Sequence, residues 1–280
     1  MSRVNDELES ITRRNKIVWE QTYRLSDAYK TSPGKIIGQF SNDDLKKLDH
    51  LIEAKKNIIK PKIVKVINVD PMEVAKAVAE KGVIPLVVNS GSQNDPLKII
   101  ETGPVGPEWD LLRRSNICNS IVPDTMYPIS QDKNLYFPNV TVFRSETYDS
   151  LKKTFKIAVI TSIPVSSPGI IQTQNNGKIT ESYENNRDHD RMYERIERIF
   201  EIAILKRHNC IIFNDFGIPQ NNPIGAVIDM FNKAIAKYPI RYVFFAIQEP
   251  LLDRLKRRKA QKDYKPYILF HAKINRQTYL

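Results

Sequence analysis

The sequence of 280 residues predicts an α/β fold in which helices cover both faces of a central sheet. From residue 62 onward, strand patterns alternate with helical patterns. Several of the strands are short continuous apolar runs, such as "VIPLVVN" and "NCIIFNDFG". Such runs are typical of strands buried on both faces, and alternation with helices favours a layered α/β domain.

Two helices are predicted ahead of the first strand, over residues 5–26 and 41–56. The first carries an apolar side made of Leu8, Ile11, Ile17, Val18, Trp19 and Tyr23. The second begins at Ser41, a good N-cap, and shows helical apolar spacing. The sequence therefore predicts a helical extension, residues 1–60, packed on a core domain of residues 61–249 and followed by a basic segment, residues 250–280.

The core elements follow in order from local signals. The helix predicted over 70–82 has Asp70 as cap, Pro71 in its first turn and Gly82 to end it. A long polar loop is predicted over 166–188, which is either a mobile loop or lid or a disordered segment. The other elements are strands at 62–69, 83–89, 139–144, 155–165, 209–217 and 240–249, and helices at 107–121, 188–208 and 222–239.

The charge balance is basic, with a formal net charge of +11. Part of the excess is concentrated in 253–265, "DRLKRRKAQKDYK". Like charges this close favour a polyanionic partner or a solvated helix face. The residues of this candidate nucleic-acid patch are Arg254, Lys256, Arg257, Arg258 and Lys259.

A cytoplasmic protein is expected. No apolar run is long enough to cross a bilayer, "MSRVNDELES" lacks the apolar region of a secretory signal, and only Cys118 and Cys210 are present. The frequent Asn, Ile and Lys suit a large DNA virus, in which case the compartment is the host cytoplasm, or an AT-rich microbe. Neither the cysteines nor the four histidines show metal-ligand spacing, so no metal or cofactor is expected.

The order of the segments resembles that of the microbial-type poly(ADP-ribose) glycohydrolases, a branch of the macro-domain superfamily. The resemblance rests on "DPMEVAKAVAEKG", "PLVVNSGS", "PEWDLLRRS", "YFPNVTVFR", "FKIAVITSIPV" and "IIFNDFG", which follow one another as in that family. It implies a three-layer α/β/α macro-domain-like fold with a mixed central sheet. Active members carry three consecutive glycines that close backbone amides around a diphosphate, then Gln-Glu-Glu, whose second glutamate is the general acid.

This chain departs from that pattern at the catalytic position. Pro107 replaces the glutamine, Glu108 keeps the first glutamate position, and Trp109 stands where the catalytic glutamate is expected. An indole cannot perform the proton transfer of a carboxylic acid. Glu101 and Asp110 are the weak substitutes that remain for an acid. Trp109 is read as a core residue, with a stacking surface in a ligand cleft as the alternative, and Glu108 as a solvated first-turn carboxylate.

A candidate ligand site follows from the resemblance and from the strand ends, where ligands bind in such sheets. Arg113 and Arg114 are weighed as phosphate clamps against ordinary helix salt bridges. Phe216 is a candidate for stacking on a ribose or base, and an ordinary turn is the alternative reading of its loop. The predicted ligand-binding residues are Asn89, Asn94, Gly103, Gly106, Glu108, Asn214, Phe216 and Gly217.

Three functions remain open. The first is a catalytically degenerate relative of these glycohydrolases that binds ADP-ribose, a related nucleotide or an ADP-ribosylated protein. The second is an active ADP-ribose glycohydrolase with a relocated acid. The third is an interaction protein that uses its basic C-terminal segment for nucleic acid or a protein partner.

Overall fold

The computed structural model describes residues 2–56, 62–175, 177–248 and 265–274, and the chain forms two compact units. The first unit holds residues 1–38, 75–161 and 249–262, and the second holds 39–74, 162–248 and 263–280. The predicted division at residues 60 and 249 stays a prediction. No helix in the described part of the chain is long and apolar enough to span a membrane.

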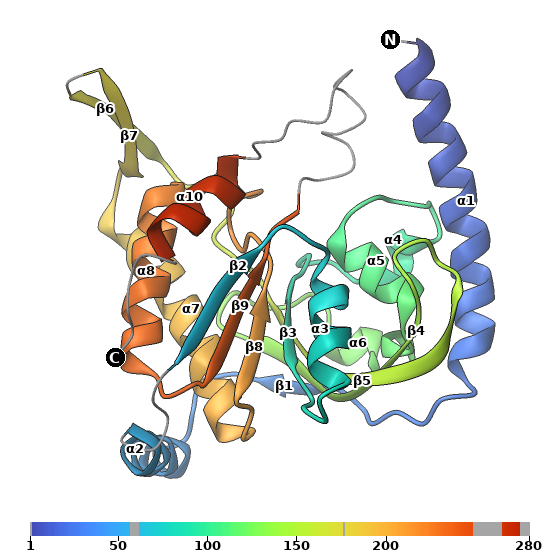
Figure 1. The fold of residues 1–280 in the computed structure, drawn as a ribbon, viewed down its shortest axis with the longest axis horizontal. Helices are drawn as coiled ribbons and strands as arrows, with labels where there is room; N and C mark the ends of the chain where they lie inside the picture. The colour runs from blue at the N-terminus through green and yellow to red at the C-terminus, as the bar shows by residue number, and fades with distance from the viewer. Residues whose placement is uncertain (1, 57–61, 176, 249–264, 275–280) are drawn as a thin grey trace. The chain divides into compact units, whose positions relative to one another are not determined.

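The predicted fold class is confirmed: the chain has a mixed central sheet flanked by helices (Figure 1). The first unit contributes strands in the order β1-β4-β5-β3 and the second in the order β8-β9-β2. The pair β4–β5 is antiparallel, whereas β8–β9 and β9–β2 are parallel.

The elements have the following bounds. In the first unit they are α1 Ser2–Ser26, β1 Lys35–Ile37, β3 Leu86–Ser90, α4 Pro96–Ile100, α5 Pro107–Arg114, the 3-10 helix η1 Ile117–Ser120, α6 Pro123–Met126, β4 Asn134–Arg144 and β5 Ser150–Ser162. In the second they are α2 Asn42–Lys56, β2 Ile63–Ile67, β6 Ile170–Asn175, β7 Lys178–Tyr183, α7 Asn186–Leu205, β8 Cys210–Phe213, α8 Ile224–Lys237, β9 Tyr242–Ala246 and α10 Lys265–Ile274. The chain passes between the units within helix α3, Pro71–Ala79, after residue 74, and again at the end of β5, after residue 161.

The local signals for helix starts are confirmed. The Asp70 side chain accepts a hydrogen bond from the backbone N–H of Met72 at 2.9 Å, at the start of α3. At the start of α2, Ser41 and Asp44 bond reciprocally: the Asp44 N–H donates to Ser41 Oγ, and the Ser41 N–H donates to Asp44 Oδ2. These bonds satisfy amide groups that the first helical turn leaves without intrahelical partners.

The buried face of α1 differs from the predicted apolar side. Val18 and Trp19 are buried as expected, but Ile17 and Tyr23 are 51% and 56% exposed. Three polar residues of α1 are buried in addition, namely Asn15, Thr22 and Ser26. A search for apolar periodicity misses these three residues because each is polar and buries its side chain only with a hydrogen-bond partner.

The segment predicted as the loop 166–188 contains a two-stranded hairpin, β6–β7, which is a correction. Its strands pair from Ile170–Tyr183 to Asn175–Lys178, and Figure 1 shows the hairpin extending away from α8. Most residues of both strands, "IIQTQN" and "KITESY", are polar, and Gly177 in the connection has φ +75°. A glycine suits this left-handed turn. Because most side chains of the two strands are polar, the strands lack the apolar–polar alternation that predicts a half-buried strand.

The core of the second unit is aromatic and includes α10. The rings of Phe231 and Phe245 lie 4.9 Å apart between centroids, and Phe270 of α10 lies 5.4 Å from Phe245. Phe270 and Ile274 are fully buried. Part of the predicted basic segment 250–280 is therefore a core helix of the second unit.

Candidate functional site at the end of strand β3

The polar side chain at the end of β3 belongs to a buried cluster in the first unit. Leu86, Val87 and Val88 are almost completely buried, and Asn89 follows them with 6% of its surface exposed. The Asn89 Nδ2 donates to Glu108 Oε1 at 3.3 Å and to Thr161 Oγ1 at 3.2 Å. The partner that a buried amide requires is therefore another side chain of the same unit.

Glu108 is the central residue of this cluster, which corrects its reading as a solvated carboxylate. Only 7% of Glu108 is exposed, and its Oε2 accepts the backbone N–H of Ser92 at 3.0 Å. Burial raises the pKa of Glu108 from 4.5 to about 7, although the bonds from Ser92 and Asn89 act in the opposite direction. Desolvation outweighs both hydrogen bonds and leaves a carboxyl group that gains or loses its proton near neutral pH.

Gly91 allows the loop after β3 to lie close to Thr161 and Glu108. A Cβ at Gly91 would lie 2.3 Å from Thr161 Cγ2 and 3.2 Å from Glu108 Oε1. Any larger residue would force these side chains to shift, so the absence of a side chain at this position lets the loop after β3 lie against the cluster.

Tyr127 is a further member that the sequence did not reveal. Burial raises the pKa of its phenol, and the negative charges of Glu108 and Asp95 raise it further. Tyr127, Glu108, Asn89 and Thr161 line the same small cavity of about 10 Å³, which has space for little more than a water molecule. A nucleotide does not fit inside this cavity and would have to lie outside it.

Trp109 is half-buried, so its predicted role as a core residue and the alternative role as a stacking surface both stay predictions. A Cβ added to Gly106 would lie 3.4 Å from Trp109 Cδ1, which places the indole beside the helix start. Gly106 is the N-cap of α5 and has φ 144°. A half-exposed aromatic ring next to a glycine backbone offers a surface for stacking.

The two substitute acids lie elsewhere. The Asp110 carboxylate accepts a hydrogen bond from the Tyr148 hydroxyl, and its Oδ1 lies 3.8 Å from Arg113 Nη1. Glu101 is exposed at the end of α4 and lines an open cavity with Trp19, Tyr23 and Arg24 of α1. Neither carboxylate lines the small cavity that is lined by Glu108 and Tyr127.

The arginines of α5 hold the first unit together, so their reading as phosphate clamps is not supported. Arg113 is fully buried and donates from Nη2 to the Pro104 carbonyl at 2.6 Å and from Nε to the Asn15 carbonyl at 3.3 Å. Arg114 is 2% exposed and its Nε donates to the Arg144 carbonyl at 3.4 Å.

The loop that precedes α5 is fixed against α1. The Asn15 side chain donates to the carbonyls of Gly103 and Pro104. A Cβ at Gly103, whose φ is +81°, would lie 2.5 Å from the Thr12 carbonyl. Gly103 therefore has a packing role, whereas Asn94 is exposed in the loop after β3. Ligand contacts of Asn94, Gly103 and Gly106 stay predictions.

The second unit carries the other predicted ligand residues. Asn214 is 6% exposed and Phe216 is fully buried, so stacking on a ligand would require Phe216 to move. Gly217 has φ +84°, and a Cβ there would lie 2.3 Å from Met192 Cε, so the turn requires glycine. The roles of Asn214, Phe216 and Gly217 toward a ligand stay predictions.

Two predictions concern the rest of the chain. The basic patch at Arg254, Lys256, Arg257, Arg258 and Lys259 lies outside the described residues. Within the described ranges, no group of three or more His, Cys, Asp or Glu side chains is placed to hold a metal ion.

Comparison with known proteins identifies the fold. No protein-family model and no curated protein match the chain. Among solved structures, poly(ADP-ribose) glycohydrolase from Thermomonospora curvata is similar with a TM-score of 0.70 at 15% identity, over 93% of this chain and 99% of that one. The same enzyme bound to the inhibitor ADP-HPD has a TM-score of 0.64 at 15% identity, over 87% and 97% of the two chains.

The enzyme from Deinococcus radiodurans is also similar. Its complex with ADP-ribose has a TM-score of 0.64 at 16% identity, over 86% of this chain and 94% of that one. Similarity over nearly the full length of both chains, at identities this low, concerns the fold. The chain therefore has the fold of the microbial poly(ADP-ribose) glycohydrolases, as its segment order predicts.

Proposed function

We propose that this protein binds ADP-ribose, or a related nucleotide, at the end of β3 and does not hydrolyse it. The observation that carries the proposal is the buried Glu108 carboxyl group, held by the Asn89 side chain and the Ser92 backbone N–H. Placing a titrating carboxyl in a desolvated position costs stability, and such groups cluster at functional sites. The fold likeness to proteins solved with ADP-ribose supports the choice of ligand.

The proposed contacts use the outer side of the cluster. Trp109 offers a partly exposed ring for stacking, and the loop after β3 offers the exposed Asn94. Glu108 accepts a hydrogen bond from a ligand hydroxyl when ionised and donates one when protonated. An ADP-ribosylated protein presents the same chemistry and is the proposed partner.

The loss of hydrolysis follows from the residues at the catalytic position. Cleavage of the glycosidic bond requires an acid that protonates the leaving oxygen. The indole of Trp109 cannot supply that proton. The carboxylate of Asp110 already accepts a hydrogen bond from the Tyr148 hydroxyl.

Calorimetric titration with ADP-ribose tests binding. We expect saturable heat for the wild-type protein and weaker binding by at least tenfold for Asn89→Ala, since about 1.4 kcal/mol corresponds to a factor of ten. Asn5→Ala, an exposed asparagine of α1, is the matched control and should bind as the wild type does. Absence of heat at millimolar ADP-ribose would leave only the fold likeness.

A second function is favoured by one observation, the pKa of Glu108 near 7. If hydrolysis occurs, Glu108 is a better candidate acid than Glu101 or Asp110. It would protonate the leaving oxygen as the C–O bond breaks, and its carboxylate would then take the proton of the attacking water. Release of ADP-ribose from poly(ADP-ribose), abolished by Glu108→Gln and retained by Glu101→Gln, would establish this function in place of the first.

A further inference from the structure

An open cavity of about 650 Å³ lies in the first unit between α1 and α4. The apolar part of its lining consists of Trp19, Tyr23 and Leu97. The rings of Trp19 and Tyr23 lie 5.6 Å apart between centroids and are tilted by 53°. Trp19 is almost completely buried, whereas Tyr23 is 56% exposed. The cavity is therefore large enough for a small ligand and presents the Tyr23 ring as an accessible aromatic surface.

Four exposed charged side chains line the rest of this cavity. They are Lys16, Glu20 and Arg24 of α1 and Glu101 of α4. Among the residues that the structure describes, none of these four forms an ion pair. Two cations and two carboxylates around an aromatic ring favour a ligand that carries both an anionic group and hydrogen-bond donors.

Three of the lining residues follow one another along one face of α1. Tyr23, Glu20 and Lys16 are separated by three and four residues, so their side chains are neighbours on the helix surface. They cover about 10 Å of the helix axis, at about 1.5 Å per residue. A nucleotide presents matching groups in the same order: a base that stacks on the ring, ribose hydroxyls that donate to the carboxylate, and a phosphate that attracts the ammonium group.

We infer that this cavity binds a guanine nucleotide, whose base stacks on Tyr23. The two remaining charges select the base. Guanine presents the acceptors O6 and N7, which suit the Arg24 guanidinium, and the donors N1–H and N2–H, which suit the Glu101 carboxylate. Adenine has an amino donor in place of O6 and an acceptor at N1. It would direct a donor at Arg24 and an acceptor at Glu101, so guanine is the base that fits.

This site is separate from the cluster around Glu108. Pro96 of α4 lines the small cavity beside Glu108, whereas Leu97 and Glu101 of the same helix line this one, and the two cavities share no lining residue. Binding of a guanine nucleotide here is therefore independent of the proposed binding of ADP-ribose at the end of β3.

Calorimetric titration of the full-length protein with GMP tests this site. We expect saturable heat and an affinity for GMP about tenfold higher than for AMP, since contacts to both edges of guanine are lost with adenine. Tyr23→Ala should weaken GMP binding about tenfold, because the stacking surface is removed. Glu101→Gln should weaken GMP binding and remove the preference over AMP, because an amide places a donor where the carboxylate had only acceptors.

Lys16→Ala separates the phosphate contact from the base contacts. It should weaken the binding of GMP and leave the binding of guanosine, which has no phosphate, unchanged. Equal losses for the two ligands would contradict a phosphate contact at Lys16.

The two tryptophans distinguish this site from the end of β3. GMP should shift the indole N–H signal of Trp19, which lines the cavity, and leave that of Trp109 in place. Titration with ADP-ribose, which tests the proposed function, should be unaffected by Tyr23→Ala.

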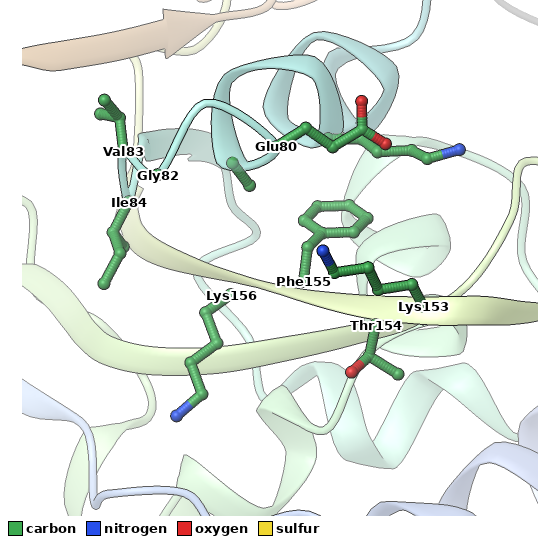
Figure 2. Close-up of a pocket in the computed structure, with 10 residues that line it drawn as sticks. Glu80, Gly82, Val83, Ile84, Lys153, Thr154, Phe155 and Lys156 are labelled. Atoms are coloured by element: carbon green, nitrogen blue, oxygen red, sulfur yellow. The ribbon is translucent and has the colours of Figure 1, made fainter.

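The matched controls come from a cavity of about 230 Å³ between the end of α3 and β5, also in the first unit (Figure 2). Figure 2 shows Lys153 projecting from β5 toward the helix that carries Glu80. Lys153→Ala and Glu80→Gln remove the same charges from exposed positions as Lys16→Ala and Glu101→Gln do, and should bind GMP as the wild type does.

Four results would overturn the site. They are the absence of saturable heat at millimolar GMP, equal affinities of the wild-type protein for GMP and AMP, losses in the control variants as large as those in the site variants, and a GMP-induced shift confined to Trp109.

Discussion

At the residue scale, contacts between residues distant in the sequence determine the environment of Glu108. The sequence predicts that Glu108 lies in the first turn of a helix, where a carboxylate is normally solvated and is stabilised by the helix dipole. Its burial depends on Asn89 and Gly91, which are distant in sequence and close in space. No local pattern reports such proximity, so the pKa near 7 could not be predicted.

The raised pKa of Glu108 gives a pH dependence of stability. Between pH 4.5 and about 7 the folded protein holds a proton on Glu108 that the unfolded chain has lost. The free energy of unfolding therefore falls as pH rises through this window, by no more than about 3.5 kcal/mol from this group, at about 1.4 kcal/mol per pKa unit. Glu108→Gln should remove this part of the dependence in urea denaturation at pH 5 and pH 8. Glu101→Gln, at an exposed position, should retain it.

Gly91 gives a second prediction at this scale. Gly91→Ala should destabilise the protein by about 1–3 kcal/mol, because the new methyl group would overlap Thr161 and crowd Glu108. Chemical denaturation measures the change. Gly38→Ala is the matched control, since its Cβ would meet only Lys133 Cγ at 3.8 Å, and a loss as large as that at Gly91 would contradict this account.

At the element scale, the sequence predicts α1 as a helix, but only part of the side that it predicts as packed is buried. Figure 1 shows α1 running alongside the part of the first unit that carries α4 and α5. Buried polar side chains, above all Asn15, replace some of the expected apolar contacts. The hairpin β6–β7 was missed for a related reason, since polar strands lack the alternation that marks a half-buried strand.

Asn15→Ala should cost about 1–3 kcal/mol, because the carbonyls of Gly103 and Pro104 lose a buried donor. Thermal unfolding compared with Asn5→Ala, the exposed asparagine of the same helix, gives the measurement. Equal melting temperatures of the two variants would mean that Asn15 does not secure the loop before α5.

Helix α10 offers a test in the second unit. Phe270→Ala should destabilise by about 3–5 kcal/mol, since Phe270 is fully buried against Phe231 and Phe245. Ile268→Ala, on the 40% exposed position of the same helix, should change stability far less. Similar losses at both positions would argue against α10 as a core element.

At the scale of the whole molecule, the alternation of strands and helices predicted the fold class, and the order of segments predicted the likeness to microbial poly(ADP-ribose) glycohydrolases. Both depend on patterns summed over long stretches, which tolerate local errors. The site depends on single contacts, so Asn89 and Glu108 were identified as candidates without their mutual bond, and Tyr127 was not found.

The most direct measurement of ligand binding uses the two tryptophans of this chain. Addition of ADP-ribose to the ¹⁵N-labelled protein should shift the indole N–H signal of Trp109, which is half-buried beside Gly106, and leave that of Trp19 on α1 unchanged. A Trp109 signal that stays in place at millimolar ADP-ribose, or a shift confined to Trp19, would contradict a binding site at the end of β3.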